Sequence, residues 1–383
     1  MIYDKNTVYY DNTLMTYVKE KKDIDFKEDP FNEVDALLLC QLVYPRLERF
    51  VPKLKKQHTG DNYTENTSKI RTVGWPDLDT PSSRKQLFGG SFYGPMYEKL
   101  FHEIKNSHRY GQILLGLLNI VFDSKKMIQF TALTMFLDEH NSFIIFRGTD
   151  NSIAGWKENF RYSYMRKWPA HGLAAQYLQK VSKIITGNLY IGGHSKGGNL
   201  AVYASAQNAE SIQNRIRRIF SFDGMGFRAS FYHTEGYQRI CNKIFKLVPQ
   251  ESIIGMLYLP EKGYHIVESY EHGLLQHDLM NWKIRKGSFV LTESFSRKHH
   301  RLIRRLNLWL RSLSGKERKE FSELLFRSFG DLLEQEAVQT MMEEKSILKI
   351  IREKVKNMTK SERKLFRHSL FRFLFPQKTI WQS

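Results

Sequence analysis

Residues 193–197, Gly-His-Ser-Lys-Gly, have the types and spacing of a nucleophile elbow, a sharp turn between a strand and a helix. On such a turn the serine hydroxyl projects alone, and the helix that follows favours negative charge near its first amides. A side chain at Gly193 or Gly197 would collide with the neighbouring strand or helix, so glycine suits both positions. We therefore predict Ser195 as a nucleophile and the Lys196 amide as a donor to the oxyanion that forms.

A serine is a weak nucleophile, so it needs a base to take its proton and an acid to orient that base. His277 follows the last strand-like segment, where a base would project, and His272 is a near competitor. Asp223 comes directly after an apolar strand, at the edge where open α/β sheets expose their working groups, and we prefer it as the acid. Glu251, at the end of the next strand, stays open as the alternative acid.

A second oxyanion donor is expected in the loop 147–150, Arg-Gly-Thr-Asp, which follows an earlier strand. Gly148 permits a close approach of the backbone, and Thr149 offers both an amide and a hydroxyl. One such donor lowers the barrier by roughly 3 to 4 kcal/mol. The aromatic stretch 152–168 is interpreted either as a lid over an apolar acyl pocket or as aromatic side chains of the core. This chemistry needs neither a metal nor a cofactor, and we expect none.

Strand and helix patterns alternate over most of the chain, which predicts an α/β fold. We expect a mostly parallel sheet with helices on both faces, followed by a C-terminal extension that is all helical. Helices are predicted before about residue 60, with Asn32 as an N-cap, within about 93–119, at about 171–185 and from 196. Strands are predicted at 127–137, 141–147, 189–191, 216–222, 243–248 and 264–269.

The chain has 383 residues and a formal net charge of +19 at pH 7, and this charge is unevenly distributed. Residues 297–383 hold 21 Lys and Arg against 10 Asp and Glu, so they supply +11 of the excess. We therefore divide the chain into a hydrolase-like part, 1–296, and a basic helical extension, 297–383. No secretory signal is evident at the start, and the apolar run 113–122 is too short to span a bilayer. Two cysteines give no disulfide framework, and we expect a cytoplasmic protein.

The extension contains two segments that match each other at a separation of 45 residues. Apolar residues from Leu302 to Leu313 correspond to apolar residues from Ile347 to Met358. Beyond them, both Ser314–Glu317 and Thr359–Glu362 have the residues of a capping box, which begins a helix by satisfying its first free amides. We infer two copies of a helical hairpin, whose apolar faces must pack on each other or on the rest of the protein.

The positive charge of the extension favours an anionic partner. Its Lys and Arg residues alternate with leucine, isoleucine and aromatic residues, which suits a membrane surface as well as a solvated basic face. We favour the solvated basic face, and the alternative is a peripheral association with the inner face of the membrane; nucleic-acid binding is not expected.

Two known groups share short motifs with this sequence. The segments Phe146–Thr149, FRGT, and Gly193–Gly198, GHSKGG, resemble the pattern of the class 3 lipases. Further motifs are similar to the bacterial Mbeg-like family of α/β-hydrolases, and together they cover most of residues 1 to about 330. These motifs are FNEVDA at 31–36, GWKE at 155–158, GHSKGGNLA at 193–201, SFDG-x-GF at 221–227 and QHD at 276–278, with Trp282.

The resemblance implies an α/β-hydrolase fold, Ser195 as the nucleophile, His277 as the base and an ester or lipid substrate. Class 3 lipases place their acid after the strand that leads here to Glu251, whereas Asp223 occupies the position used by other lipases. The second hairpin, about 344–375, is not a feature we associate with the family. The sequence thus predicts a serine esterase or lipase, and the alternative is a non-catalytic hydrolase-fold protein that binds anionic membrane or nucleic acid through its basic tail.

Overall fold

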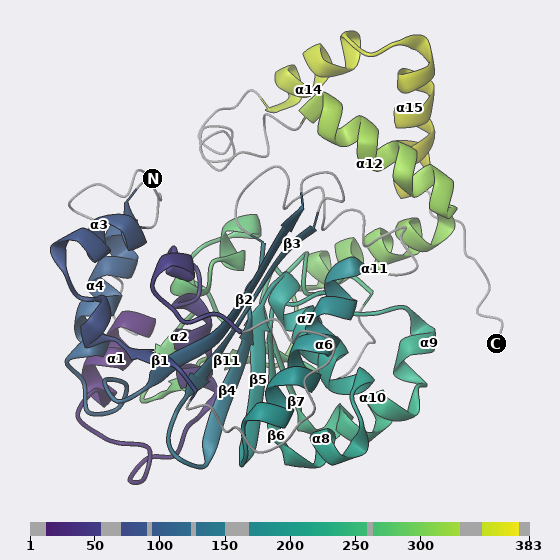
Figure 1. Cartoon of the computed structure of the whole chain (residues 1–383). Coiled ribbons are helices and arrows are strands. Elements are labelled where there is room, and N and C mark those ends of the chain that lie inside the picture. Colours follow the sequence, from purple (N-terminus) through teal and green to yellow (C-terminus); the bar gives the residue numbers. More distant parts are fainter. Residues whose placement is uncertain are drawn as a thin grey trace.

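The computed structural model describes residues 13–54, 70–89, 94–123, 128–149, 168–258, 263–329 and 347–374. Within these ranges, nine strands form one sheet in the order β1-β2-β3-β4-β5-β6-β7-β8-β11 (Figure 1). The strands are β1 (Thr72–Gly74), β2 (Leu114–Asp123), β3 (Ile128–Phe136), β4 (Asn141–Phe146), β5 (Asn188–His194), β6 (Ile216–Phe222), β7 (Ile244–Pro249), β8 (His265–Val267) and β11 (Leu291–Thr292). A separate short ribbon pairs β9 (Ile284–Arg285) with β10 (Ser288–Phe289).

The middle of the sheet is parallel, and its two edges are antiparallel. Strands β4 to β8 run in one direction. By contrast, β1 to β4 pair antiparallel at one edge, and β11 pairs antiparallel with β8 at the other. Parallel neighbours need long connections, which helices supply between β4 and β7. The predicted α/β-hydrolase fold class is confirmed, and every parallel strand ends at the same edge of the sheet.

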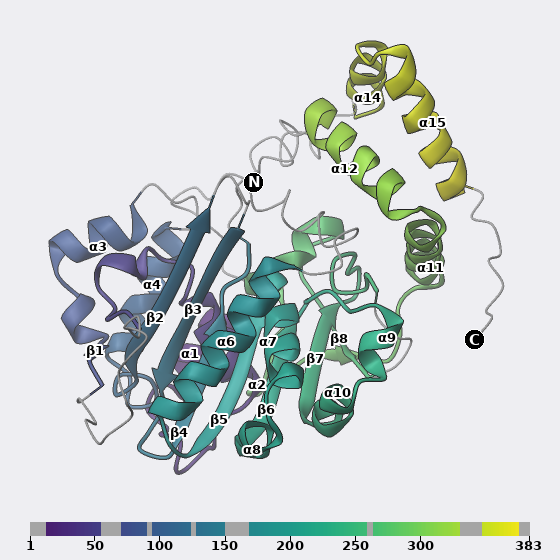
Figure 2. The ribbon, with the colours of Figure 1, turned by 45° about the vertical axis from the view of Figure 1, so that its right-hand side comes forward.

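Helices cover both faces of this sheet, and each face has its own apolar core (Figures 1 and 2). On one face lie α1 (Leu14–Lys21), α2 (Glu33–Gln41), α3 (Pro81–Phe88) and α4 (Gly94–Lys105). On the other lie α6 (Pro169–Ile184), α7 (Lys196–Gln207), α8 (Glu210–Arg215), α9 (Ala229–Tyr232) and α10 (Glu235–Ile240). The predicted strands at 141–147 and 216–222 agree with β4 and β6.

Helix α2 is fixed at its start by a buried polar cluster. Asn32 caps the helix as expected, and its side chain accepts from the amides of the first turn. The carboxylate of Asp35 is fully buried and pairs with Arg109 at 2.5 Å, while Tyr17 and Tyr110 donate hydrogen bonds to it. A buried charge requires such partners, because desolvation would otherwise disfavour it. The cluster therefore fixes the position of α2, and with it the position of the segment that follows this helix.

One secondary-structure prediction is wrong in its second half. Helical spacing was expected over about 93–119, and α4 does cover 94–105, but β2 begins at Leu114. The run 113–122 is almost continuously apolar, and such a run does not distinguish a helix from a buried strand by periodicity. Pairing with β3 decides the outcome, because the short link between the two segments lets them form an antiparallel hairpin.

The extension consists of α11 (Arg297–Ser312), α12 (Gly315–Phe329), α14 (Ile347–Lys356) and α15 (Lys360–Leu374). The last three stand apart from the sheet (Figure 2), whereas Ile303 of α11 belongs to an apolar cluster with Val248 of β7 and Ile266 of β8. Helices α12 and α15 begin and end 45 residues apart. Both capping boxes are formed, because Ser314 and Thr359 each donate a backbone amide to the glutamate three residues later, at 2.7 Å. The division of the chain at residue 296 stays a prediction.

The two hairpins contact each other reciprocally. Glu317 of the first pairs with Arg372 of the second at 2.9 Å. Their counterparts 45 residues away, Glu362 and Arg327, pair at 2.5 Å. Phe321 stacks on its own counterpart, Phe366, with ring centroids 6.4 Å apart. Reciprocal and self-paired contacts of this kind are what two like units produce around a two-fold axis, which supports the duplication hypothesis.

Candidate functional site

The turn after β5 has the strained backbone that an elbow requires. Ser195 has φ +56° and ψ −124°, an unusual conformation for a residue with a side chain. A Cβ on Gly193 would come within 2.4 Å of the backbone of Gly197, and one on Gly197 within 2.0 Å of the Phe146 carbonyl. The steric reason for both glycines is therefore present. The Ser195 amide donates to the Phe222 carbonyl at 2.8 Å, which ties the turn to β6.

The side chains of His277 and Asp223 meet beside this turn. Nδ1 of His277 lies 2.5 Å from Oδ2 of Asp223, and the His277 ring lies 4.4 Å from the ring of His194, the residue before the serine. Ser252 donates its hydroxyl to the other oxygen of Asp223 at 2.5 Å. Burial opposes ionisation of Asp223, but the hydrogen bonds from His277 and Ser252 outweigh it and hold the pKa of this carboxyl below its ordinary value.

The alternative acid and the alternative base lie together at a different place. The carboxylate of Glu251 accepts a hydrogen bond from the Gly273 amide at 2.5 Å. Nδ1 of His272 is 4.0 Å from the same carboxylate, and its side chain is 82% exposed. The structure thus brings Asp223 to His277 and leaves Glu251 beside His272.

The loop after β4 lies against the elbow. The point where a Cβ on Gly148 would stand is 2.7 Å from the His194 carbonyl and 3.5 Å from Cβ of Ser195. Only glycine fits there, and Thr149 follows it directly. Lys196 begins α7 immediately after the serine, and its buried ammonium donates to the Gln129 carbonyl at 2.5 Å. The loop that carries Thr149 and the helix that begins with Lys196 therefore both lie next to Ser195.

A residue that sequence reasoning missed, Tyr44, reaches the same place from the chain after α2. Its hydroxyl lies 2.3 Å from the Cβ point of Gly148, and Cβ of Ser195 lies 3.5 Å from that point. The Tyr44 hydroxyl therefore lies within about 6 Å of Cβ of Ser195. The hydroxyl is 3.2 Å from Nδ1 of His194, and burial raises the pKa of Tyr44, so the phenol stays protonated. A tyrosine at the end of an apolar helix carries no signal of this contact in the sequence.

Comparison with known proteins identifies the family. The family model described as Mbeg1-like matches residues 104–327, more than half of the chain. The chain belongs to the Mbeg1-like family. No curated protein matches it.

Two solved lipase structures are similar to this Mbeg1-like chain. The crystal structure of M37 lipase is 15% identical with a TM-score of 0.29; the match covers 42% of this chain and 63% of that lipase, less than two thirds of its length. The native Rhizomucor miehei lipase propeptide complex is 13% identical with a TM-score of 0.30, over 56% of this chain and 78% of that one. At these identities the likeness concerns the fold alone.

Three further side chains of this Mbeg1-like protein hold the segment that begins with Asp223. Lys246, buried on β7, donates to the Gly224 carbonyl, and burial lowers the pKa of its amine to about 8. Asn199 donates to the carbonyls of residues 225 and 226, so its side-chain oxygen is the acceptor for Nε2–H of His171 at 2.7 Å. Burial lowers the pKa of His171 to about 4, which keeps the ring neutral. The acid is thus fixed from β7 and from α7.

The basic extension also reaches the acid, through α11. Nε2 of His299 donates to the Ser252 carbonyl at 2.9 Å, and the Ser252 hydroxyl is itself bonded to Asp223. Asn307, two turns later, donates to the Met256 carbonyl and accepts from the amide of residue 258. Helix α11 therefore holds the segment 252–258 at both ends.

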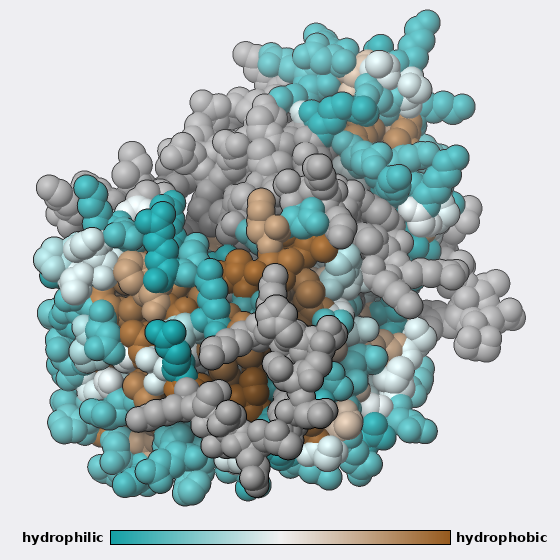
Figure 3. Space-filling view, viewed as in Figure 1, coloured by the Kyte–Doolittle hydropathy of each residue, from teal (hydrophilic) through white to brown (hydrophobic). Residues whose placement is uncertain are grey.

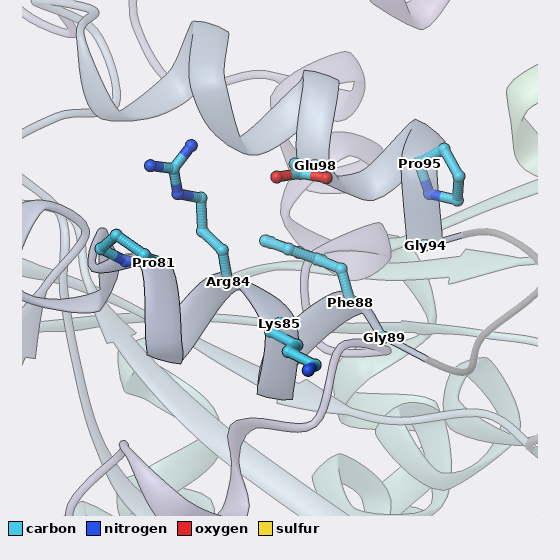
Figure 4. Close-up of a pocket in the computed structure, with 8 residues that line it drawn as sticks. All are labelled: Pro81, Arg84, Lys85, Phe88, Gly89, Gly94, Pro95 and Glu98. Atoms are coloured by element: carbon cyan, nitrogen blue, oxygen red, sulfur yellow. The ribbon is translucent and has the colours of Figure 1, made fainter. Parts of the chain in front are cut away.

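A surface hollow of about 550 Å³ lies between α3 and α4 (Figure 4). Arg84 and Glu98 face it from the two helices, and none of the predicted site residues lines it. The aromatic stretch 152–168, interpreted as a lid or as core aromatics, lies outside the described residues except for Trp168, which is buried at the start of α6. In the described ranges, no three His, Cys, Asp or Glu side chains gather to hold a metal ion. The described helices include none that is both long and apolar enough to cross a bilayer.

Proposed function

We propose that this protein is a serine hydrolase that cleaves a carboxylic ester of an acyl or lipid substrate through an acyl-enzyme on Ser195. The contact between His277 and Asp223 beside a strained serine turn carries the proposal. Asp223 accepts the Nδ1–H of His277, so the neutral imidazole keeps Nε2 free of a proton and ready to accept one. The low pKa of Asp223 keeps it ionised during this step.

In the first half of the reaction, Oγ of Ser195 attacks the carbonyl carbon of the ester, and its proton passes to Nε2 of His277. The amides of Thr149 and Lys196 donate to the oxyanion of the tetrahedral intermediate. The intermediate then collapses, the bond from carbon to the alcohol oxygen breaks, and His277 returns its proton to the leaving alcohol. The acyl group remains on Ser195.

In the second half, His277 takes a proton from water, and the hydroxide attacks the acyl carbonyl. The same two amides hold the second oxyanion, and its collapse releases the carboxylic acid while Ser195 recovers its proton from His277. Asp223 stabilises the imidazolium in both halves without accepting a proton itself. All protons are returned, so one ester and one water give one alcohol and one acid.

A fluorophosphonate probe tests the proposal directly. We expect native protein to be labelled and Ser195→Ala to remain unlabelled. Ser205→Ala is the matched control, because Ser205 is a buried serine on α7, the helix that follows Ser195, and its hydroxyl donates to the Ala201 carbonyl of that helix. This variant should label like the native protein. Equal labelling of native protein and Ser195→Ala, or no labelling of either, rejects the nucleophile and favours the non-catalytic alternative.

A panel of p-nitrophenyl esters with short and long acyl chains then defines the substrate class. Hydrolysis that requires Ser195 and rises with acyl length would support a lipid substrate. Hydrolysis confined to short esters would restrict the proposal to an esterase. We also propose the cytoplasmic, membrane-peripheral location expected from the sequence, and the association of the native protein with the membrane fraction of cells checks it.

A further inference from the structure

Helix α15 presents an outer face that combines cations with large apolar side chains. Lys360, Lys364, Arg367, Phe371 and Leu374 are all exposed. Their spacing of four, three, four and three residues places them in one row along the helix. The first three are cations and the last two are apolar, so the row changes from charged to apolar toward the end of the helix.

The apolar end of this row is largely exposed to solvent. Phe371 is 61% exposed, and Leu370 and Leu374, which adjoin it, are 45% and 44% exposed. The opposite face of α15 is in use: Ser369 is buried, and Phe366 and Phe373 pack on aromatic rings of α12 and α11. The packing of the two hairpins against each other therefore does not bury the outer face of α15. Singly exposed apolar residues are ordinary, but three neighbouring ones at one helix end mark a binding surface.

The charge around this face is strongly positive. Residues 297–329 carry ten Lys and Arg against three Asp and Glu, and residues 347–374 carry nine against two. Two of these five acids, Glu317 and Glu362, are already paired with arginines between the hairpins. Figure 3 shows brown apolar atoms surrounded by hydrophilic ones over the helices of the extension. The partner that complements such a surface is anionic and has an apolar interior.

We propose that the outer face of α15, defined as Lys360, Lys364, Arg367, Leu370, Phe371 and Leu374, binds the surface of an anionic lipid bilayer. The cations would lie over the lipid headgroups, and the phenyl and isobutyl groups would enter the boundary of the acyl chains. A nucleic acid would satisfy the cations but would leave the two leucines in water.

The position of this face relative to the site has a consequence for catalysis. The last turns of α15 lie against α11, where Nε1 of Trp309 donates to the Ser369 carbonyl at 2.9 Å. Helix α11 in turn contacts the segment that holds Asp223. A bilayer bound at α15 would therefore keep the site close to lipid esters. This consequence rests on the proposed function, whereas the lipid binding itself does not.

Flotation with vesicles tests the proposal, using phosphatidylcholine alone and an equimolar mixture of phosphatidylcholine and phosphatidylglycerol. We expect the full-length protein to float only with the anionic vesicles, and less as salt is added. Lys360→Glu/Lys364→Glu should weaken partitioning at least about 30-fold, since each cation near an anionic surface is worth close to a factor of five. Phe371→Ser/Leu374→Ser should weaken it about tenfold.

The duplication supplies the matched control. Lys316 and Lys319 are exposed on α12, and Lys319 is the counterpart of Lys364 at the separation of 45 residues. Lys316→Glu/Lys319→Glu therefore changes the net charge by the same amount on a different face, and this variant should float like the native protein. Circular dichroism and melting temperature confirm that each variant is folded.

Every other outcome contradicts the proposal. An equal loss of flotation in the two double lysine variants would show that binding depends on the net charge of the extension and not on this face. Equal flotation with neutral vesicles, or none with anionic ones, removes anionic lipid as the partner. Binding of duplex DNA that depends on Lys360 and Lys364, without flotation, would make nucleic acid the partner. Ser195→Ala should float normally, so a failure here is separate from a failure of the labelling experiment.

Discussion

Two acidic residues follow neighbouring parallel strands, Asp223 after β6 and Glu251 after β7, and their surroundings differ. Asp223 is 1% exposed and receives hydrogen bonds from two side chains and one backbone amide. The side chain of Glu251 is 40% exposed and receives one hydrogen bond from a backbone amide. An acid that orients an imidazole must itself be held on its remaining lone pairs. A place at the end of a strand is therefore not enough to make a carboxylate the orienting group.

Replacing each acid by its amide gives the largest expected contrast. Asp223→Asn should lower kcat for ester hydrolysis about 10⁴-fold, because the amide keeps the shape but favours the wrong tautomer of His277. Glu251→Gln is the matched change at the neighbouring strand and should alter kcat less than threefold. Steady-state kinetics with a p-nitrophenyl ester measures both. The assignment is wrong if the two losses are reversed or similar in size.

Much of this site could be predicted because its determinants are local. The elbow depends on two glycines and a serine in five residues, and the collisions at Gly193 and Gly197 follow from chain geometry alone. Strands β4 and β6 are apolar segments bounded by polar turns, and their limits agree with the predicted ones. The capping residue Asn32 was equally evident, since a cap requires only the neighbouring residues.

The rest depends on contacts between distant parts of the chain. The choice between Asp223 and Glu251 could not be made from the sequence, because both end apolar strands and only the path of the chain to His277 separates them. Ser252 and Tyr44 were missed for the same reason: each is an ordinary polar residue whose partner lies far away in the sequence. The strand β2 was missed because a continuous apolar run lacks a diagnostic period.

Substitution of Ser252 tests, through the stability of the protein, whether the hydrogen bonds that Asp223 receives set its ionisation. Its hydroxyl favours the charged form of Asp223, so Ser252→Ala should raise the pKa of that carboxyl toward its unfolded value near 3.8. A lowered pKa in the folded state stabilises the protein above pH 3.8, and this stabilisation disappears as the pH falls through the folded pKa. The free energy of unfolding of the variant should therefore be about 1 to 3 kcal/mol lower than that of the native protein at pH 7. On acidification, this free energy should fall less in the variant than in the native protein.

Urea unfolding at pH 7 and pH 3 measures these differences, with Ser205→Ala as a buried serine that does not contact Asp223. Between pH 7 and pH 3, the free energy of unfolding of the Ser205→Ala control should change by the same amount as that of the native protein. If Ser252→Ala is as acid-sensitive as the native protein, its hydroxyl does not set the ionisation of Asp223.

The smallest effect is expected where the extension meets the site. His299→Phe keeps a ring beside Phe295 but removes the donor to the Ser252 carbonyl, so Asp223 should be held less firmly. One neutral hydrogen bond is worth about 1 kcal/mol, and we expect kcat to fall about fivefold with KM unchanged. His300→Phe changes the exposed neighbouring histidine and should leave kcat as it is. His299→Gln keeps a donor and should restore part of the rate. If His299→Phe lowers the melting temperature while kcat stays constant, α11 stabilises the fold without positioning Asp223.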